Sequence, residues 1–300
     1  MLSYLVGRRR RLVATLISIL VTIYILTRHK KVSHEEDADA AFEETTKGPR
    51  LAILVPFRDR FDELMTFVPY MTRYLQNQPI GPFKIFILNQ SNKYRFNRGA
   101  LANVGFMLAK SQSDYIAIHD IDLIPVNRNL SYGYPETGPH HLTAPEYHPN
   151  YNYDKYFGGI LLISNEHFEL VNGFSNRYFG WGLEDDEFYT RVKAAKLKIS
   201  RPMNLTTGKN DTFIHFHYGR KRDSNRSREQ RDALKYRDRI TGLRDLKYSV
   251  TSKHSLMIDG EFECLVFNIE LHCDTKQTPW CLPNHTKQRG HATSKKTTTQ

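Results

Sequence analysis

The 300-residue sequence contains no Gly-x-Gly-x-x-Gly segment and no Gly-x-x-x-x-Gly-Lys-Ser/Thr segment. The first absence argues against a dinucleotide-binding fingerprint, and the second argues against a glycine loop that cradles phosphate. A phosphorylated ligand would therefore need other groups to neutralise its charge. Cysteine is also scarce, because the chain has only Cys264, Cys273 and Cys281, which leaves room for one disulfide.

We expect that disulfide to join Cys273 to Cys281, because the short polar loop between them, residues 274–280, can turn back on itself. An oxidising compartment would favour this pairing. A zinc site at the two cysteines is the rival interpretation, but no second pair of ligands lies nearby in the sequence.

Long apolar runs are limited to the N-terminal region, where residues 12–26 contain only Thr, Ser and Tyr as polar interruptions. Four arginines, residues 8–11, precede this run, and residues 28–31 are basic. A membrane span needs about 20 apolar residues, so this shorter run suits a thin early-secretory membrane. The pattern predicts a cytoplasmic tail over residues 1–11 and a transmembrane signal anchor over residues 12–27, with the remainder lumenal. A cleaved signal peptide is the alternative.

The remainder of the chain divides by composition. Residues 33–48 are acidic and polar with few large apolar side chains, so residues 28–49 are predicted to form a flexible stem. With 40% hydrophobic and 12% aromatic residues, the chain can bury one substantial core. We therefore expect a single lumenal domain over residues 50–283 and a disordered tail over residues 284–300.

The formal net charge of +11 could indicate a nucleic-acid partner. However, part of this charge lies beside the apolar run and in residues 287–296, and much of the rest lies in residues 220–239 among Asp223, Glu229, Asp232 and Asp238. Such a mixture is typical of a solvated helix face, so we predict no nucleic-acid binding. The functional alternative is attraction of an acidic acceptor protein or a polyanionic product.

Six Asn-x-Ser/Thr sequons are compatible with a lumenal protein. Asn89 ends an expected buried strand and is therefore the least suitable of them. The preferred glycosylation candidates are Asn129, Asn204 and Asn210.

Short apolar runs alternate with amphipathic stretches along the first half of the domain. Strands are expected over residues 51–57, 83–88 and 115–119, and helices over residues 59–76 and 98–110. This alternation predicts an α/β fold with a mainly parallel sheet. Ligands of such sheets bind beyond the carboxyl ends of the strands, where Arg58, Asn89, Asp120 and Asp122 lie.

Asp120 and Asp122 follow the apolar segment 115–119 with the i, i+2 spacing that would place both carboxylates on one side of a strand. Carboxylates are hard oxygen ligands for a divalent ion, and such an ion can stabilise a diphosphate leaving group. His215 and His217 have the same spacing and could complete a site, because imidazole with carboxylate suits Mn²⁺ or Zn²⁺ better than Mg²⁺. Two structural histidines are the alternative.

A third pattern places Trp181 between two glycines, directly before four consecutive acids, residues 184–187, at the start of a helix expected to run to about residue 197. Acids at a helix N-terminus are ordinarily explained by capping and by the macrodipole. Four acids exceed that need, and an exposed tryptophan is a suitable platform for a sugar ring. A carboxylate beside it could act as general base toward a sugar hydroxyl.

Six segments occur together in one order over roughly residues 50–283: Pro56-Phe-Arg-Asp-Arg, Phe96-Asn-Arg, Asp120-Ile-Asp, Tyr156-Phe-Gly-Gly, Trp181-Gly-Leu-Glu-Asp-Asp-Glu and His215-Phe-His. This set resembles the β-1,4-galactosyltransferase family. The resemblance implies a GT-A fold with a mixed, mainly parallel central sheet, a Mn²⁺ cofactor, UDP-galactose as donor and inversion at the anomeric carbon. The domain over residues 50–283 would then be the catalytic domain.

Within the family, the His-x-His form, the Arg-Lys-Arg-Asp that follows it and the Thr-Pro-Trp-Cys ending at Cys281 are similar to members that act on β-xylose. This likeness implies galactose transfer to O4 of β-xylose on a proteoglycan core protein, in glycosaminoglycan linker synthesis. It also implies a single-pass type II protein of the Golgi membrane.

The resemblance also implies a role for each matching residue. Asp185 would be the catalytic base, and Asp122, His215 and His217 would ligate Mn²⁺. The donor would be bound by Pro56, Phe57, Arg58, Arg60, Phe96, Arg98, Asp120, Asp122, Tyr156, Gly159 and Trp181. The acceptor would be bound by Tyr151, Trp181, Leu183, Glu184, Asp185 and Asp186.

Several of these residues have ordinary alternatives. Phe57 and Phe96 could be core residues, Arg60 could pair with Asp59 or Asp62 on the helix surface, and either Tyr153 or Tyr156 could be the contact. At the level of function, the alternatives are a GlcNAc-directed galactosyltransferase or GalNAc-transferase, a metal-dependent hydrolase, and a silent lectin-like scaffold.

Overall fold

The computed structural model describes residues 48–216, 223–235 and 237–283. The chain divides into two units, Met1–Gly48 and Pro49–Gln300, and the fold described below is that of the second. The predicted anchor, almost all of the predicted stem, the tail and His217 lie outside the described residues. Within the described ranges, the structure has no helix with the length and hydropathy needed to cross a bilayer.

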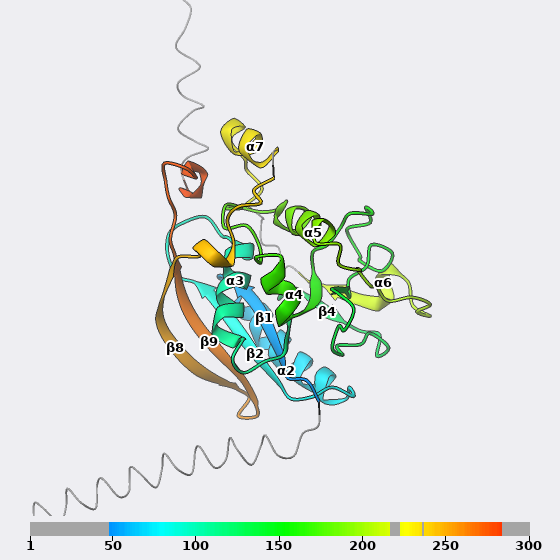
Figure 1. The fold of residues 1–300 in the computed structure, drawn as a ribbon. Coiled ribbons are helices and arrows are strands. Elements are labelled where there is room, and N and C mark those ends of the chain that lie inside the picture. Colours follow the sequence, from blue (N-terminus) through cyan, green and yellow to red (C-terminus); the bar gives the residue numbers. More distant parts are fainter. Residues whose placement is uncertain (1–47, 217–222, 236, 284–300) are drawn as a thin grey trace, which may run out of the picture. The chain divides into compact units, whose positions relative to one another are not determined.

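Helices and strands alternate through the first half of the domain (Figure 1). The helices are α2 (Phe61–Gln76), α3 (Arg98–Ala109), α4 (Asn165–Leu170), α5 (Glu184–Ala194), α6 (Lys209–Thr212) and α7 (Arg228–Lys235), with short 3₁₀ turns η1 (Leu243–Asp245) and η2 (Pro279–Cys281). The strands are β1 (Leu51–Phe57), β2 (Phe83–Gln90), β3 (Tyr115–His119), β4 (Leu123–Pro125), β5 (His140–His141), β6 (Ile160–Ser164), β7 (Phe213–His215), β8 (Tyr248–Ile258) and β9 (Phe262–Leu271).

Seven strands form the central sheet, in the order β5-β6-β3-β1-β2-β9-β8. Strands β3, β1, β2 and β9 run parallel to one another. Strands β5, β6 and β8 pair antiparallel with their neighbours. The sheet is therefore mixed with a parallel centre, as the family resemblance implied, and the alternation of strands and helices predicted the parallel part.

The two faces of the sheet carry separate hydrophobic cores, because successive side chains of a strand point to opposite faces. Ile53 and Val55 of β1 pack with the apolar side of α2 in one core. Ala52 and Leu54 pack with α3, α4 and α5 in the other. Residue Gly105 allows α3 to approach closely, since a Cβ there would lie 2.4 Å from Leu88. The parallel strand ends between these layers are thus held rigidly.

Strands β8 and β9 form a long antiparallel hairpin that the sequence analysis did not predict. Asp259 and Gly260 make its turn, with φ values of 53° and 71°. An Asp-Gly pair in the left-handed region is typical of a two-residue hairpin turn, so this dipeptide is the signal that could have identified the hairpin. Strand β9 then pairs with β2 in parallel and completes the centre of the sheet.

Helix α5 ends at Ala194, about three residues before the predicted end. Lys196 adopts a left-handed conformation with φ of 57°, and the backbone N–H of Leu197 returns to the carbonyl of Val192. This closure satisfies a terminal helix carbonyl and prevents the helix from continuing.

Candidate functional site

The carboxyl ends of β1 and β2 are joined by Arg58. Its guanidinium donates hydrogen bonds to the backbone carbonyls of Gln90, Asn92 and Tyr94, at 3.3, 3.4 and 2.8 Å. The guanidinium also lies 5.7 Å from the ring centroid of Phe96. Burial lowers the pKa of Arg58 from its usual value. Arg58 therefore fixes the loop after β2, which leads into α3.

Arg98, at the first position of α3, connects the end of β3 to the start of α5. Its Nε donates to Oδ1 of Asp120 at 2.6 Å, and Nη2 donates to the carbonyl of Gly159 at 3.3 Å. Nη1 lies 4.0 Å from Oε1 of Glu184. Although burial opposes the charged form, Asp120, Glu184 and Asp185 together raise the pKa of Arg98, so it remains a cation.

The i, i+2 spacing predicted that Asp120 and Asp122 lie on one face of a strand, and this prediction was wrong. Strand β3 ends at His119, and the next three residues form a turn in which the N–H of Leu123 donates to the carbonyl of Asp120. The two carboxylates consequently face different partners. Asp120 is paired with Arg98, whereas Asp122 lies beside His215.

A two-stranded antiparallel sheet brings Asp122 and His215 together. Leu123 of β4 pairs with His215 of β7, and the N–H of Phe216 donates to the carbonyl of Asp122 at 2.8 Å. Nε2 of His215 lies 3.8 Å from Oδ1 of Asp122. The other ring nitrogen, Nδ1, lies 2.6 Å from the side-chain amide of Asn150.

This arrangement fits a divalent ion by the chemistry of its donors. A carboxylate oxygen and an imidazole nitrogen converge, and the outer imidazole nitrogen is fixed by a hydrogen bond, as metal-binding histidines commonly are. Small side-chain rotations would bring both atoms to one ion. In the described part of the chain, no group of three or more His, Cys, Asp or Glu side chains gathers as a metal site, and the predicted third ligand, His217, lies outside it.

Helix α5 begins with the four predicted acids in its first turn. Leu183 precedes them in a left-handed conformation with φ of 78°, which is strained for a branched side chain. The backbone N–H of Asp186 donates to Oδ1 of Asp185 at 3.0 Å. Glu184 is buried, and its Oε2 has no hydrogen-bond partner among the described residues.

These carboxyl groups are crowded and partly shielded from water. Burial, followed by the charges of Glu184 and Asp186, raises the pKa of Asp185 to about 8. Burial likewise raises the pKa of Glu184 and of Asp186, while Arg98 and Arg237 respectively oppose these shifts. Before any ligand binds, the Asp185 carboxyl is therefore mostly protonated at neutral pH.

Gly158 provides the space in which the Asp185 carboxylate lies. A Cβ at this position would be 2.7 Å from Oδ2 of Asp185 and 3.3 Å from the hydroxyl of Tyr156. The next residue, Gly159, has φ of 74° and lies against Thr143. The Gly-Gly pair after Phe157, part of the Tyr156-Phe-Gly-Gly segment, thus permits a close approach between this loop and α5.

Aromatic side chains form a wall beside these acids. The rings of Tyr151 and Tyr156 are 5.2 Å apart, and those of Tyr151 and Trp181 are 6.2 Å apart. Trp181 is 43% exposed, which makes its indole available to a ligand. Tyr156 is buried, and burial raises its pKa well above the usual value, with Asp120 and Asp185 adding to the shift.

The remaining predicted donor residues are placed around the same strand ends. Pro56 and Phe57 are buried at the end of β1, as the core alternative for Phe57 expected. Phe96 is partly buried against the second core. Arg60 pairs with Glu63 at 2.9 Å, so it is engaged on its own helix.

Three contributors were not among the predicted site residues. Asn150 contacts His215, Gly158 accommodates Asp185, and Tyr153 is hydrogen-bonded to Asp186. Tyr153 had been considered only as a substitute for Tyr156. Asn150 belongs to no recognisable motif, because its role depends on the contact between its own loop and β7.

A buried arginine, Arg95, anchors the segment that begins at Asp223 and is hydrogen-bonded to Trp181. Its guanidinium pairs with Asp223 at 2.7 Å and donates to Oε1 of Gln230 and to the carbonyl of Trp280. The Cys273–Cys281 disulfide, predicted from sequence, lies in the same small apolar cluster as Trp280. Cys264 is buried and free.

The sequon residues Asn129, Asn204 and Asn210 are exposed, and their glycosylation stays a prediction.

Two family models match the sequence. One, described as the N-terminal region of glycosyl transferase group 7, covers residues 22–134. The other, described as the N-terminal domain of galactosyltransferase, covers residues 138–216. Together they include every predicted catalytic, metal-binding, donor-binding and acceptor-binding residue except His217.

Curated relatives match over most of the domain. Beta-1,4-galactosyltransferase 7 of Drosophila melanogaster is 50% identical over 235 residues, which is 77% of this chain and 72% of the relative. The Homo sapiens protein of the same name is 51% identical, over 80% of this chain and 73% of its own. Xylosylprotein 4-beta-galactosyltransferase of Caenorhabditis elegans is 41% identical, over 79% and 83% respectively.

Solved structures agree in fold. The catalytic domain of the Drosophila enzyme with xylobiose is 50% identical and aligns with a TM-score of 0.75, covering 78% of this chain and 98% of that one. A point mutant of the same enzyme, in complex with manganese, UDP-Gal and xylobiose, is 49% identical and aligns with a TM-score of 0.76, covering 78% and 99%. The fold is thus that of the GT-A galactosyltransferases, and the chain belongs to the β-1,4-galactosyltransferase family.

Proposed function

We propose that this chain transfers galactose from UDP-galactose to O4 of β-xylose on a proteoglycan core protein, with inversion at the anomeric carbon. The observation that carries the proposal is the position of the Asp185 carboxylate. It lies between Gly158 and the N-terminus of α5, next to the Tyr156 ring and the exposed Trp181. The Drosophila relative crystallised with UDP-Gal and xylobiose supports the identity of both substrates.

The donor would bind at the carboxyl ends of β1, β2 and β3. Arg58 and Arg98 are the cations at this edge, and each is held in place by the contacts given above. Mn²⁺, when bound, would be held by Asp122 and His215, with His217 as the proposed third ligand, and would supply positive charge for the diphosphate leaving group. The manganese complex of the Drosophila relative supports this cofactor.

In the reaction, Asp185 would accept the proton of the xylose O4 hydroxyl while that oxygen attacks C1 of galactose. The new C1–O4 bond forms as the bond between C1 and the β-phosphate oxygen breaks, so UDP leaves with the bonding electron pair. In the ligand-free protein the pKa of Asp185 is raised to about 8, so this carboxyl is mostly protonated at neutral pH. The positive charge of a bound cation would lower that pKa, and the carboxylate form could then accept the O4 proton.

The acceptor ring would lie against the wall formed by Tyr151 and Trp181. The free Oε2 of Glu184 is a buried acceptor without a partner among the described residues, and a sugar hydroxyl would satisfy it. Asp186 would accept a second hydroxyl. Tyr156, being bulky and buried, would restrict the space at C2 of the donor and favour galactose over an N-acetylated sugar.

The same proposal includes the location of the protein. The apolar run over residues 12–26, with basic residues on both sides, supports a single-pass type II anchor in the Golgi membrane and a lumenal catalytic domain. Imaging of the tagged full-length chain with a Golgi marker, combined with protease protection of the C-terminus in sealed vesicles, tests this. A C-terminus digested without detergent would contradict it.

The decisive experiment for the activity is product formation from UDP-galactose and a β-xyloside in the presence of Mn²⁺. Parallel reactions should use a β-GlcNAc acceptor, UDP-GalNAc as donor, and no acceptor. We expect a β-1,4-linked galactosyl-xylose product, with turnover of the other pairs lower by about two orders of magnitude, since lost buried hydrogen bonds and clashes set such ratios. Preferential use of GlcNAc, or release of free galactose without an acceptor, would reject the proposal.

A further inference from the structure

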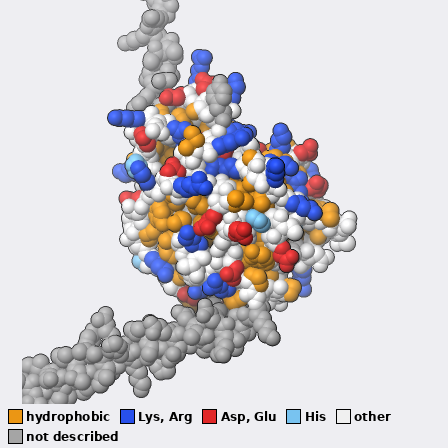
Figure 2. Space-filling model, in the orientation of Figure 1, with side chains coloured by type: hydrophobic (Ala, Val, Ile, Leu, Met, Phe, Trp, Pro, Cys, Tyr) orange, Lys and Arg blue, Asp and Glu red, His pale blue; other side chains and the backbone are white. Residues whose placement is uncertain are grey.

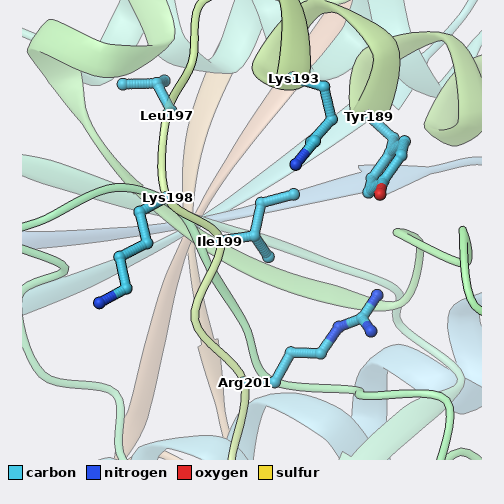
Figure 3. A pocket seen from close by; sticks show the side chains of 6 residues that line it. All are labelled: Tyr189, Lys193, Leu197, Lys198, Ile199 and Arg201. Carbon is cyan, nitrogen blue, oxygen red and sulfur yellow. The ribbon is translucent and has the colours of Figure 1, made fainter.

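Two adjoining hollows extend from the acid-rich start of α5 along its outer side. One has a volume of about 330 Å³ and is lined by Asp186, Tyr189, Thr190 and Lys193 of α5 together with basic residues of neighbouring loops. The other, of about 270 Å³, shares Tyr189 and Lys193 and continues to Arg201 (Figure 3). The α5 residues recur at spacings of three and four, so they lie on one face of the helix.

The linings of both hollows are strongly basic. Their cationic side chains come from α5, from the segment after it, and from the loops before β6 and after α7. They are Lys155, Lys193, Lys198, Arg201, Arg237 and Arg239, and we call them the basic groove. Among the described residues that line the hollows, Asp186 is the only acid.

The cations of the basic groove are not neutralised by the fold. None of the six forms an ion pair with another described residue. Within the part of the chain that the structure describes, Arg201 donates only to the backbone carbonyls of Asp154 and Tyr156. In Figure 3, Lys193 points toward Ile199, the guanidinium of Arg201 lies on the side of Tyr189, and Lys198 extends away from the other labelled side chains. Figure 2 shows that basic side chains gather over the region of α5 and α7 on this face.

We propose that the basic groove binds acidic side chains of the acceptor polypeptide, close to the serine that carries the sugar. The inference rests on the proposed function, because it requires an acceptor sugar attached to a protein. A sugar held by Asp185 and Asp186 places its polypeptide at the mouth of the groove, where Asp186 is part of the lining. Attachment through the sugar gives the peptide a high effective concentration there.

Electrostatics selects an acidic peptide. Asp186 lines the groove, and its carboxylate alone would repel an acidic acceptor. The groove cations reverse this effect, and Lys155 and Arg237 already act on Asp186 by lowering its pKa against burial. From Asp186 to Lys193 the helix rises about 10 Å, a distance that three extended residues cover. The recognised acids should therefore lie within about four residues of the serine.

The test uses three synthetic peptides with the same xylosylated serine and Glu, Gln or Lys at the flanking positions. With the wild-type chain at about 50 mM salt, kcat/KM should be about tenfold higher for the Glu peptide than for the Gln peptide, and lowest for the Lys peptide. The preference should shrink at about 0.5 M salt, because screening shortens the range of the attraction. Equal kcat/KM for the Glu and Gln peptides would overturn the proposal.

The location is tested by the double variant Lys193→Glu/Lys198→Glu, with Lys253→Glu on the distant edge strand β8 as the matched control. The double variant should lose the preference for the Glu peptide and gain on the Lys peptide, while its rate on a simple β-xyloside stays unchanged. Lys253→Glu should behave as wild type. A preference that survives in the double variant, or that Lys253→Glu also removes, would overturn the assignment.

Two further outcomes separate failure of the proposed function from failure of the peptide proposal. If the wild-type chain does not galactosylate the simple β-xyloside, the proposed function fails, whatever the peptides do. If the double variant instead loses binding to phosphatidylserine vesicles and keeps its peptide preference, the groove serves a membrane surface and the peptide proposal is wrong. Circular dichroism and thermal melting of each variant establish that it is folded.

Discussion

The two sides of the site differ in how their polar groups are satisfied. At the ends of the parallel strands, Arg58 and Arg98 are held by carbonyls and by the Asp120 carboxylate at 2.6 Å. At the start of α5, Oε2 of Glu184 has no partner among the described residues, Leu183 is strained, and burial raises the pKa of Asp185 to about 8. The polar groups at the strand ends, which we call the donor side, are satisfied by the fold itself. Those at the start of α5, which we call the acceptor side, are only partly satisfied without a ligand.

This difference has an energetic meaning. Satisfied ion pairs at strand ends support the fold, so the residues that would contact the diphosphate also position the strands. Buried carboxyl groups without partners destabilise the fold, and such groups are typical of functional sites. A ligand that supplies hydroxyl groups to the acceptor side would recover part of that cost on binding. Mutations on the two sides should therefore change stability in opposite directions.

The largest expected effect is that of Asp185→Asn on catalysis. The amide cannot accept the O4 proton, so kcat with a β-xyloside should fall about 10³-fold, while UDP binding measured by calorimetry stays close to wild type. Because the change removes a carboxyl group from a crowded, buried position, the ligand-free protein should melt at a higher temperature. Asp259→Asn, in the β8–β9 turn, is the control and should change neither property. Near-normal turnover by Asp185→Asn would show that another group is the base.

Removal of Arg98 should have the opposite effect on stability. Arg98→Met leaves Asp120 and the buried Glu184 without their cation, and should lower the free energy of unfolding by about 2–3 kcal/mol. The estimate is below that for a fully enclosed pair because Asp120 is 35% exposed. Urea denaturation of the ligand-free protein measures the change.

Arg228→Met is the matched control, because Arg228 pairs with Asp232 at 3.8 Å on an exposed surface, with both side chains more than half exposed. Its loss should change the free energy of unfolding by less than about 0.5 kcal/mol. Equal losses in Arg98→Met and Arg228→Met would mean that the donor side is not part of the structural support.

The smallest expected effect is on the pH dependence of stability without Mn²⁺ or donor. The folded pKa of Asp185, about 8, exceeds its unfolded value near 4, so the folded state binds more protons between these values and stability falls as pH rises through them. His119, at the end of β3, behaves in the opposite way. Burial lowers its pKa to about 4, below the unfolded value near 6.5, so stability falls as pH decreases from 6.5 to 4.

Thermal melting between pH 4 and pH 9 should therefore give a maximum at intermediate pH. Asp185→Asn should raise the melting temperature at pH 8.5 by a few degrees, about 2–4 °C, and change it little at pH 5. His119→Gln should flatten only the acidic side. A uniform shift of the whole profile by Asp185→Asn would contradict the assigned titration.

Much of the fold could be predicted from local patterns. The strand over residues 115–119 has the predicted bounds, and α3 and β1 agree to within one residue. The disulfide between Cys273 and Cys281 is also as predicted. These features depend on the periodicity of apolar residues and on short sequence separations, both of which can be seen in the sequence. In the β8–β9 hairpin only β8 is largely exposed with weak apolar alternation. The sequence analysis missed the hairpin although β9 alternates clearly and Asp259-Gly260 marks the turn.

The site was harder to predict where it depends on contacts between distant segments. The spacing of Asp120 and Asp122 suggested one strand face, but β3 ends first and the two carboxylates separate. Asn150 and Gly158 carry no local signal for their contacts with His215 and Asp185. Such contacts arise where loops that are distant in the sequence pack together, and local sequence patterns do not specify this packing.

By itself, the sequence determined the alternation of strands and helices in the first half of the domain, the residue types available for chemistry, and the family to which the chain belongs. Side-chain periodicity and motif order are properties of neighbouring residues, so they need no folded context. Only the tertiary structure decided that pairing of β4 with β7 brings Asp122 to His215, that Gly158 makes space for Asp185, and that the cations beyond Asp186 form one groove. These arrangements depend on packing between segments far apart in the chain, where burial and charge are set by the whole fold.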